Sequence, residues 1–238
     1  MEKRDTADRR RVLTWLGAGG LLASARPVLA QGGTRPTPAC VVRPEQTEGP
    51  YFVDTRLNRS DIRTDPASGV MQEGVPLRLA FNVLRVRQGG CEALSGAHVE
   101  LWQCNARGVY SGVRDRDSTV QNQKFLRGYQ GTDADGVARF TTIFPGWYPG
   151  RAVHLHFIIR AADSSRGTAR LGQFTSQLYF DDALSDRIFA GTPYSNRNGR
   201  RLRNDEDGLY RSGGSRLVLA PLKEGEGYSA TFDIGLQG

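Results

Sequence analysis

Cysteine is scarce in this sequence of 238 residues, which contains only Cys40, Cys91 and Cys104. No two of them form a Cys-x-x-Cys pair, so a metal site built from thiolates is disfavoured. In an oxidising compartment one disulfide could form, and any of the three pairings is possible. The sequence also lacks an apolar segment long enough to cross a bilayer, so no membrane span is expected.

The composition has no extreme that would indicate a fibrous or disordered chain. Hydrophobic residues make up 38% and charged residues 24% of the sequence, which is ordinary for a globular protein. The formal net charge of +7 invites a nucleic-acid partner. Residues 1–30 alone carry six basic and three acidic side chains, however, which leaves +4 for the rest of the chain. No nucleic-acid partner is therefore expected.

The first 30 residues have the pattern of an export signal. A twin-arginine sequence at 8–13 precedes a short, modestly apolar stretch, and residues 28–30 are the small or apolar residues typical before a cleavage position. We therefore expect a twin-arginine signal peptide at 1–30 and a periplasmic or secreted protein. An amphipathic anchor helix that stays attached is the alternative.

Most of the remaining chain alternates between apolar and polar residues with a period of two, which is typical of half-buried strands. Helical periodicity is confined to 182–189. A flexible lead-in rich in Gly, Pro and Thr is predicted at 31–46, before a single domain at 47–238. The pattern predicts an all-β fold, an antiparallel β-sandwich with long loops and little helix. The predicted strands are 77–84, 97–102, 137–143, 153–159, 173–180, 217–220 and 228–234.

Two of the three histidines, His154 and His156, lie two residues apart on the predicted strand at 153–159. Residues i and i+2 of a strand project from the same face, so the two imidazoles are expected side by side. This geometry is typical of a pair of metal ligands. The alternative is two solvated histidines on an exposed strand. Nothing distinguishes the third histidine, His98, which is expected at the surface.

Two tyrosines lie in segments that present them outside a strand ladder. Tyr148 belongs to the segment 144–151, where two prolines and two glycines favour a tight irregular loop. Tyr110 follows the predicted strand at 97–102. Taken singly, each tyrosine is more commonly a core or surface aromatic, and Arg151 alone would be interpreted as a surface arginine.

Five segments carry a resemblance to a known family. They are 47–51 (TEGPY), 101–111 (LWQCNARGVYS), 125–130 (FLRGYQ), 132–136 (TDADG) and 142–157 (TIFPGWYPGRAVHLHF). In this order and with this spacing they resemble the intradiol ring-cleavage dioxygenases. The similarity is greatest to exported, single-domain members similar to the β subunit of protocatechuate 3,4-dioxygenase, and it implies a prealbumin-like β-sandwich with a catalytic site.

The resemblance implies a non-haem Fe(III) cofactor with four protein ligands, which by matching position are Tyr110, Tyr148, His154 and His156. The residue types suit this metal. Two phenolates are anionic oxygen donors that favour Fe(III) over Fe(II), and two neutral imidazoles complete the set. No Asp or Glu lies within 148–156, which argues against a thermolysin-like zinc site.

The resemblance also implies the reaction and its further residues. A small aromatic diol of the catechol type would be cleaved with O2 between its two hydroxyl-bearing carbons to give a cis,cis-muconate-type product. Arg151 and Tyr148 would be catalytic, with Arg151 stabilising negative charge and Tyr148 accepting a proton. Tyr51, Arg151 and Gln177 would line the substrate site, and Gln177 would orient Arg151 or a ligand histidine.

Two other functions stay open at this point. A β-sandwich binding module would keep the scaffold without catalysis, but it would be expected to lose some of the four ligand types. A zinc hydrolase would use the histidine pair, but the carboxylate is missing. The sequence leaves open which diol is the substrate and whether the protein forms a homo-oligomer or pairs with a homologous chain.

Overall fold

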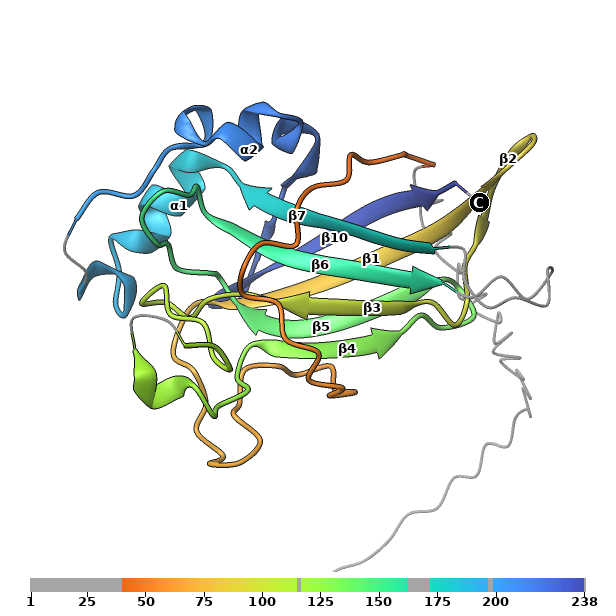
Figure 1. The fold of residues 1–238 in the computed structure, drawn as a ribbon. Coiled ribbons are helices and arrows are strands. Elements are labelled where there is room, and N and C mark those ends of the chain that lie inside the picture. The colour runs from red at the N-terminus through yellow and green to blue at the C-terminus, as the bar shows by residue number, and fades with distance from the viewer. Residues whose placement is uncertain (1–39, 115–116, 162–171, 197–198, 238) are drawn as a thin grey trace, which may run out of the picture. The chain divides into compact units, whose positions relative to one another are not determined.

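Two five-stranded sheets pack face to face in the computed structural model, which describes residues 40–114, 117–161, 172–196 and 199–237 (Figure 1). The predicted all-β sandwich with long loops is confirmed. The predicted signal peptide at 1–30 and the first part of the lead-in lie outside the described residues.

The first sheet has the strand order β2-β1-β10-β9, and β5 also pairs with β1. Alternate residues of β1 are buried, from Leu77 to Val83, as the sequence pattern predicts. Phe81 of β1 and Phe232 of β10 point towards the second sheet, where both contact Phe157. The strands are β1 (Pro76–Arg87), β2 (Gly90–Ala93), β5 (Val137–Ile143), β9 (Leu222–Glu224) and β10 (Gly227–Leu236).

The second sheet has the order β4-β3-β6-β7-β8. Its inner face, which includes Leu101, Leu155 and Phe157, packs on the first sheet and forms the core. Its outer face carries the alternate residues of the same strands: Trp102, Arg127, His154, His156, Gln177 and Tyr179. The strands are β3 (His98–Trp102), β4 (Arg127–Gly131), β6 (His154–Ala161), β7 (Gly172–Phe180) and β8 (Val218–Leu219).

Two strand pairs differ from the predicted antiparallel arrangement. β1 pairs with β10 in parallel, and β7 pairs with β8 in parallel, whereas the other pairs between named strands are antiparallel. A parallel pair needs a long connection between its strands. Nearly the whole domain separates β1 from β10, and a helical segment separates β7 from β8, so both connections are long enough. The sandwich therefore consists of two mixed sheets.

The predicted helix at 182–189 is confirmed as α1 (Asp182–Phe189). Asp181 caps it by accepting a hydrogen bond from the backbone N–H of Leu184 at 2.9 Å. The sequence pattern missed α2 (Gly208–Arg211) and the 3-10 turns Ser118–Val120, Tyr194–Asn196, Asn204–Glu206 and Gly214–Leu217. None of the helices in the described part of the chain is long and apolar enough to span a membrane.

Residues 40–46, which were expected within a flexible lead-in, are anchored to the sandwich. A disulfide joins Cys40 to Cys91 of β2, so Cys104 is the buried cysteine left outside it. The backbone of Gly235 donates to Val41 at 2.8 Å, and the next residues run on across the second sheet (Figure 1). These bonds are made with strands far along the chain, so local composition could not indicate them.

Candidate metal centre

The histidine pair is buried on the outer face of the second sheet. In the strand register His154 lies opposite Tyr179, and His156 lies between Trp102 and Gln177. Both side chains are 1% exposed, and their Nε2 atoms are 3.1 Å apart. The two imidazoles share one face, as their spacing predicts, and they are buried rather than solvated. His98 is exposed, as expected.

A hydrogen bond fixes the tautomer of His154. Its Nδ1 lies 2.7 Å from the backbone oxygen of Ala152, and because a carbonyl can only accept, Nδ1 carries the proton. The lone pair on Nε2 therefore faces the site, where the Tyr148 hydroxyl donates to it at 3.0 Å. Metal-binding histidines usually donate their other ring N–H in this way.

Packing holds His156. Its ring stacks on Trp102, with ring centroids 5.0 Å apart and planes at 9°, while its Nδ1 is buried without a hydrogen-bond partner. Gly49 approaches the ring closely, because a Cβ there would lie 3.2 Å from His156 Cε1. Burial lowers the pKa of His154 to about 3 and that of His156 well below its ordinary value. Both imidazoles are therefore neutral, the form that binds metal.

Tyr110 and Tyr148 complete a group of four side chains. Their rings are 5.7 Å apart, and the ring of Tyr110 lies 6.2 Å from that of His156. Tyr110 is fully buried, and its hydroxyl makes no hydrogen bond of good geometry. A buried hydroxyl without a partner costs about 1–3 kcal/mol. Burial raises the pKa of both phenols, so they ionise only when a strong Lewis acid displaces the proton.

The four side chains fit a ferric ion. Two phenols can supply two anionic oxygens and two neutral imidazoles two nitrogens, and hard anionic oxygen donors suit a trivalent cation. The unpartnered hydroxyl of Tyr110 is the kind of buried polar group that a metal bond satisfies. Within the described residues, no three His, Cys, Asp or Glu side chains converge, so the histidine and carboxylate set of a hydrolytic zinc site is not formed there.

The loop that carries Tyr148 packs closely against the loop that carries Tyr110, and Gly146 is the point of contact. A Cβ at this position would overlap the backbone oxygens of Asn105 and Ala106, so only glycine allows the loops to approach this closely. The Gly146 N–H donates to the oxygen of Asn105 at 3.2 Å. Because Tyr110 and Tyr148 each lie a few residues from this contact, it sets the position of one phenol relative to the other.

Arg151 lies at the edge of the group and is 17% exposed. Its Nε donates to Asp207 Oδ2 at 2.9 Å, and its Nη2 donates to Gln177 Oε1 at 2.6 Å and to Tyr179 Oη at 3.2 Å. Its Nη1 lies 3.4 Å from His154 Nε2, beside the donor atoms. The guanidinium therefore brings a fixed positive charge to the place where an anionic ligand would sit.

Gln177 and Tyr179 project from the same face of β7. Gln177 is fully buried, and its Nε2 donates to the backbone oxygen of Thr47 at 2.9 Å. The Tyr179 hydroxyl donates to Gln46 Oε1 at 2.9 Å. Gln177 thus connects Arg151 to the backbone of Thr47.

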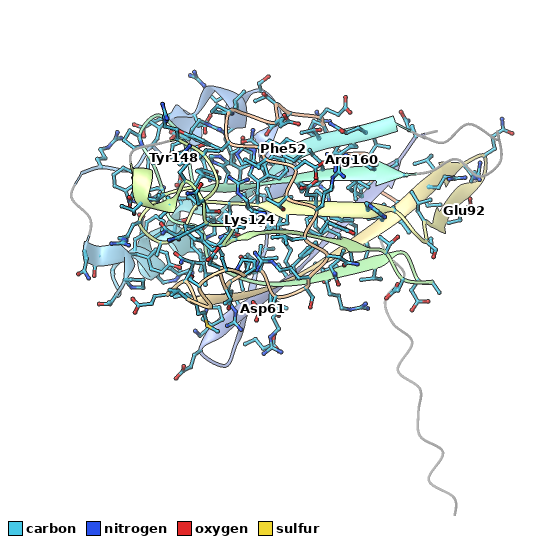
Figure 2. All side chains as sticks on the ribbon, turned by 60° about the horizontal axis from the view of Figure 1, so that its bottom comes forward. Phe52, Asp61, Glu92, Lys124, Tyr148 and Arg160 are labelled. Atoms are coloured by element: carbon cyan, nitrogen blue, oxygen red, sulfur yellow. A yellow bond between two sulfur atoms is a disulfide. The ribbon has the colours of Figure 1, made fainter. Side chains whose placement is uncertain are left out.

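Two aromatic side chains, Tyr51 and Phe52, form one wall of the site. Tyr51 stacks on Tyr110 with ring centroids 4.4 Å apart and meets the edge of Tyr148 at 5.7 Å. The next residue, Phe52, meets the edge of Trp102 with ring centroids 5.1 Å apart. The Arg160 guanidinium lies over the Phe52 ring (Figure 2). Half-buried Tyr51 is therefore placed against both tyrosines of the group.

A buried guanidinium lies behind Tyr110. The Arg127 side chain is 2% exposed, and its carbon Cζ lies 6.0 Å from the centroid of the Tyr110 ring. Nε and Nη2 donate to the backbone oxygen of Ser111 at 2.9 and 2.6 Å, while Nη1 is buried without a partner. Burial lowers the pKa of Arg127 to about 10, so the group remains a cation at neutral pH, and its charge favours the anionic form of the phenol.

The structure brings every residue selected from the sequence into this one region: Tyr51, Tyr110, Tyr148, Arg151, His154, His156 and Gln177. The sequence reasoning missed Trp102, Arg127, Tyr179 and Asp207. Strand periodicity could have indicated Tyr179, which lies two residues after Gln177. No local signal could have indicated Asp207, which is 56 positions from its partner Arg151.

Comparisons with known proteins identify relatives of this chain. A family model described as "Dioxygenase" matches residues 47–197. The chain is 32% identical over 225 residues to the protocatechuate 3,4-dioxygenase beta chain of Burkholderia cepacia, covering 90% of this chain and 87% of that protein.

Solved structures are similar as well. An intradiol ring-cleavage dioxygenase from Tetranychus urticae matches with a TM-score of 0.69 at 30% identity, over 83% of this chain and 95% of that chain. The dioxygenase domain of a carbohydrate-binding fusion protein from Streptomyces sp. SirexAA-E matches with a TM-score of 0.57 at 28% identity, over 83% and 99% of the two chains.

Proposed function

The chain belongs to the intradiol ring-cleavage dioxygenase family, and on that basis we propose that it is a non-haem Fe(III)-dependent enzyme. It would cleave a catechol-type ring with O2 between the two hydroxyl-bearing carbons and give a cis,cis-muconate-type product. The observation that carries the proposal is the buried group of two phenols and two neutral imidazoles on the outer face of the second sheet.

Tyr110, Tyr148, His154 and His156 are the residues that would hold the iron. Bound Fe(III) would supply a Lewis acid for a catechol-type substrate. The low pKa values of the two histidines keep their ring nitrogens free of competing protons. The phenolate forms of the two tyrosines would balance most of the positive charge of the ion. The Arg127 cation beside Tyr110 favours the phenolate form of that residue.

Proton transfer falls to Tyr148. Its side chain is 9% exposed, whereas Tyr110 is fully buried, so Tyr148 is the phenol that an incoming diol can reach. Its Oη, as a phenolate, would accept a proton from a substrate hydroxyl. Arg151, 3.4 Å from His154, would stabilise the negative charge that builds on the substrate.

Tyr51 and Gln177 would shape the substrate site without reacting. Tyr51 stacks on Tyr110 and presents a flat wall suited to an aromatic ring. Gln177 fixes the orientation of Arg151 through Nη2. A non-catalytic binding module would need none of these groups, and a zinc hydrolase would need a carboxylate beside the histidines, so neither alternative is favoured.

The proposal is tested by oxygen uptake and product analysis with the iron-loaded protein. The panel is catechol, protocatechuate and hydroxyquinol, with iron-loaded Tyr148→Phe as the matched variant. We expect ring cleavage of at least one diol and its loss in the variant, because phenylalanine cannot bind iron or accept a proton. No oxygen uptake with any diol by protein that contains iron would contradict the proposal.

We propose further that the protein is exported by the twin-arginine route to the periplasm or the medium. The Cys40–Cys91 disulfide supports this location, since structural disulfides persist in oxidising compartments. Replacing the twin arginines by Arg9→Lys with Arg10→Lys should retain the protein in the cytoplasm. Unchanged export of that variant, measured by cell fractionation, would contradict the route.

A further inference from the structure

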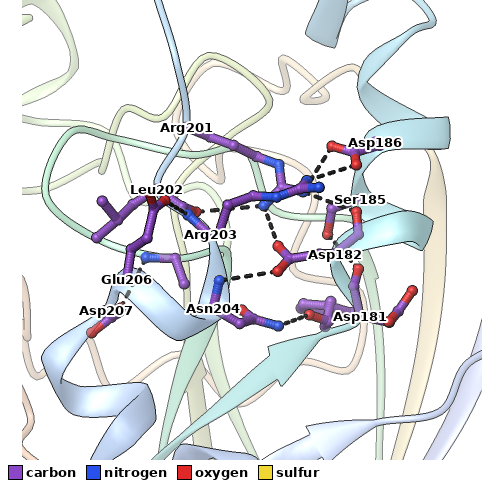
Figure 3. A network of polar contacts seen from close by, with 12 residues as sticks. Asp181, Asp182, Ser185, Asp186, Arg201, Leu202, Arg203, Asn204, Glu206 and Asp207 are labelled. Carbon is purple, nitrogen blue, oxygen red and sulfur yellow. Dashed lines mark hydrogen bonds and ion pairs between the residues drawn. The ribbon is translucent and has the colours of Figure 1, made fainter.

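Asp207 comes from a segment beyond the 47–197 range that matches the family model. A network of ion pairs and hydrogen bonds anchors this segment to α1 (Figure 3). Arg201 donates to Asp186 at 2.8 Å, and Arg203 donates to the same carboxylate at 2.7 Å. Asn204 donates to the backbone oxygen at the end of β7 at 2.8 Å. The segment that carries Asp207 is therefore attached to the strand that carries Gln177.

Both oxygens of the Asp207 carboxylate are held by backbone N–H groups. Oδ2 accepts from Ala152 at 2.9 Å, and Oδ1 accepts from Leu209 at 2.8 Å as the cap of α2. Burial acts to raise the pKa of Asp207, but the hydrogen bond from Ala152 and the charge of Arg151 bring it below its ordinary value. Asp207 is therefore a buried anion in a fixed position.

This anion fixes one edge of Arg151. Of the five N–H donors of a guanidinium, the one on Nε binds Asp207, and those on Nη2 face Gln177 and Tyr179. Nη1 lies beside His154, so its donors are the ones turned towards the site. Because Asp207, Gln177 and Tyr179 bind two edges of the planar guanidinium, its orientation is fixed.

We propose that Asp207 is a positioning residue, which holds the Arg151 guanidinium with Nη1 directed at the reacting substrate. The role rests on the proposed function, because it concerns the charge that Arg151 stabilises during ring cleavage. Without this acceptor, Nε would lose its buried partner, and the guanidinium would turn towards other acceptors such as the phenolate of Tyr148.

The test is the iron-loaded Asp207→Asn variant. Asparagine caps a helix as well as aspartate does, so its oxygen keeps the bond to Leu209. Its NH2 group then faces Arg151 Nε and the Ala152 N–H, donor against donor. We expect kcat to fall about 100-fold, the cost of a small misplacement of a catalytic group, while KM changes little. The visible spectrum of the iron-loaded variant without substrate should equal that of the wild type, because the four ligands are intact.

Two further variants separate positioning from a general structural role. Asp186→Asn breaks two ion pairs of the same segment without touching Arg151 and should lower the unfolding temperature while kcat stays at the wild-type value. Asp207→Asn placed in an Arg151→Met background should add no further loss to kcat, since its effect passes through Arg151.

Each outcome decides the question. A wild-type rate in folded Asp207→Asn, or an equal loss of kcat in Asp186→Asn, would overturn the positioning role while the proposed function stands. A further loss of kcat in the double variant would overturn it as well. If the iron-loaded wild type cleaves no diol, the proposed function fails, and the role of Asp207 fails with it.

Discussion

Both faces of the second sheet are buried along β6 from His154 to Ile159, but they differ in chemistry. Phe157 on the inner face and His156 on the outer face are neighbours on β6, with exposures of 0% and 1%. Phe157 packs among the phenylalanines of the first sheet, whereas His156 contacts Trp102, Tyr110 and a second histidine. The apolar inner face stabilises the fold, whereas burying polar groups on the outer face costs part of that stability.

The difference shows that burial alone does not identify a core. Loops from distant parts of the chain cover the outer face around the histidines: 43–60, 104–114, 117–125 and 144–151. The polar side chains beneath these loops are shielded from water, which strengthens each electrostatic interaction among them. A substitution on one face should therefore act on stability, and one on the other face should act on metal binding and the reaction.

The largest expected effects come from the two neighbours on β6. Phe157→Ala should lower the free energy of unfolding by about 3–5 kcal/mol, measured by urea denaturation of the metal-free protein, with iron binding retained by the folded fraction.

His156→Ala should abolish stoichiometric iron binding and lower ring cleavage at least about 1000-fold, the upper end for loss of one electrostatic group. If both variants lost stability equally and both retained iron, the faces would not differ as described.

The pH dependence of stability should distinguish the faces next. The folded pKa values of His154 and His156 are depressed, so protons bind the unfolded chain first as the pH falls. The free energy of unfolding of the metal-free protein should therefore fall steadily as the pH drops below about 6.5, where the unfolded histidines take up protons and the folded ones do not.

Urea denaturation at several pH values measures this slope. A slope that persists unchanged in a His154→Gln variant would assign the acid sensitivity to other groups.

A smaller effect is expected at the contact between the two tyrosine loops. Gly146→Ala should cost about 1–3 kcal/mol of stability, because a methyl group there collides with backbone oxygens that cannot move independently. It should also weaken iron binding by separating Tyr110 from Tyr148. Gly131→Ala, at the end of β4 where a Cβ would meet nothing within 4 Å, is the comparison, and a larger loss of iron affinity in Gly131→Ala would contradict this explanation.

The smallest effect belongs to the first sheet, whose outer face is solvated. The ion pair between Arg78 and Glu224 is 3.3 Å long, with side chains 66% and 43% exposed. Glu224→Gln should change stability by less than about 0.5 kcal/mol, with unchanged iron binding and turnover. A thermal shift of several degrees would show that charge on an outer face matters even without burial.

Much of the fold follows from short-range pattern. The alternation at Leu77–Val83 predicts β1, and Asp181 followed by an apolar period predicts α1. Pairing over long distances does not follow. Nothing local places β10 parallel to β1, and nothing local chooses Cys40–Cys91 over the other two cysteine pairings.

The candidate site, like the fold, was predictable from the sequence only in part. The spacing of His154 and His156 indicates a shared face, and the family resemblance adds Tyr110 and Tyr148. Trp102 and Arg127 could not be inferred, because their contacts with His156 and Tyr110 depend on strand register and loop path. Asp207 reaches Arg151 only because the fold brings the two segments together.

The most direct test of the ferric site is the visible spectrum of protein loaded with one equivalent of Fe(III), recorded together with its iron content. Phenolate ligands give Fe(III) a charge-transfer band that colours the protein red-brown. We expect one iron per chain, a broad visible band, and a shift or loss of that band in Tyr110→Phe and Tyr148→Phe. Iron bound without a visible band, or a band unchanged in both variants, would contradict the assignment of the outer face as a tyrosine–histidine iron site.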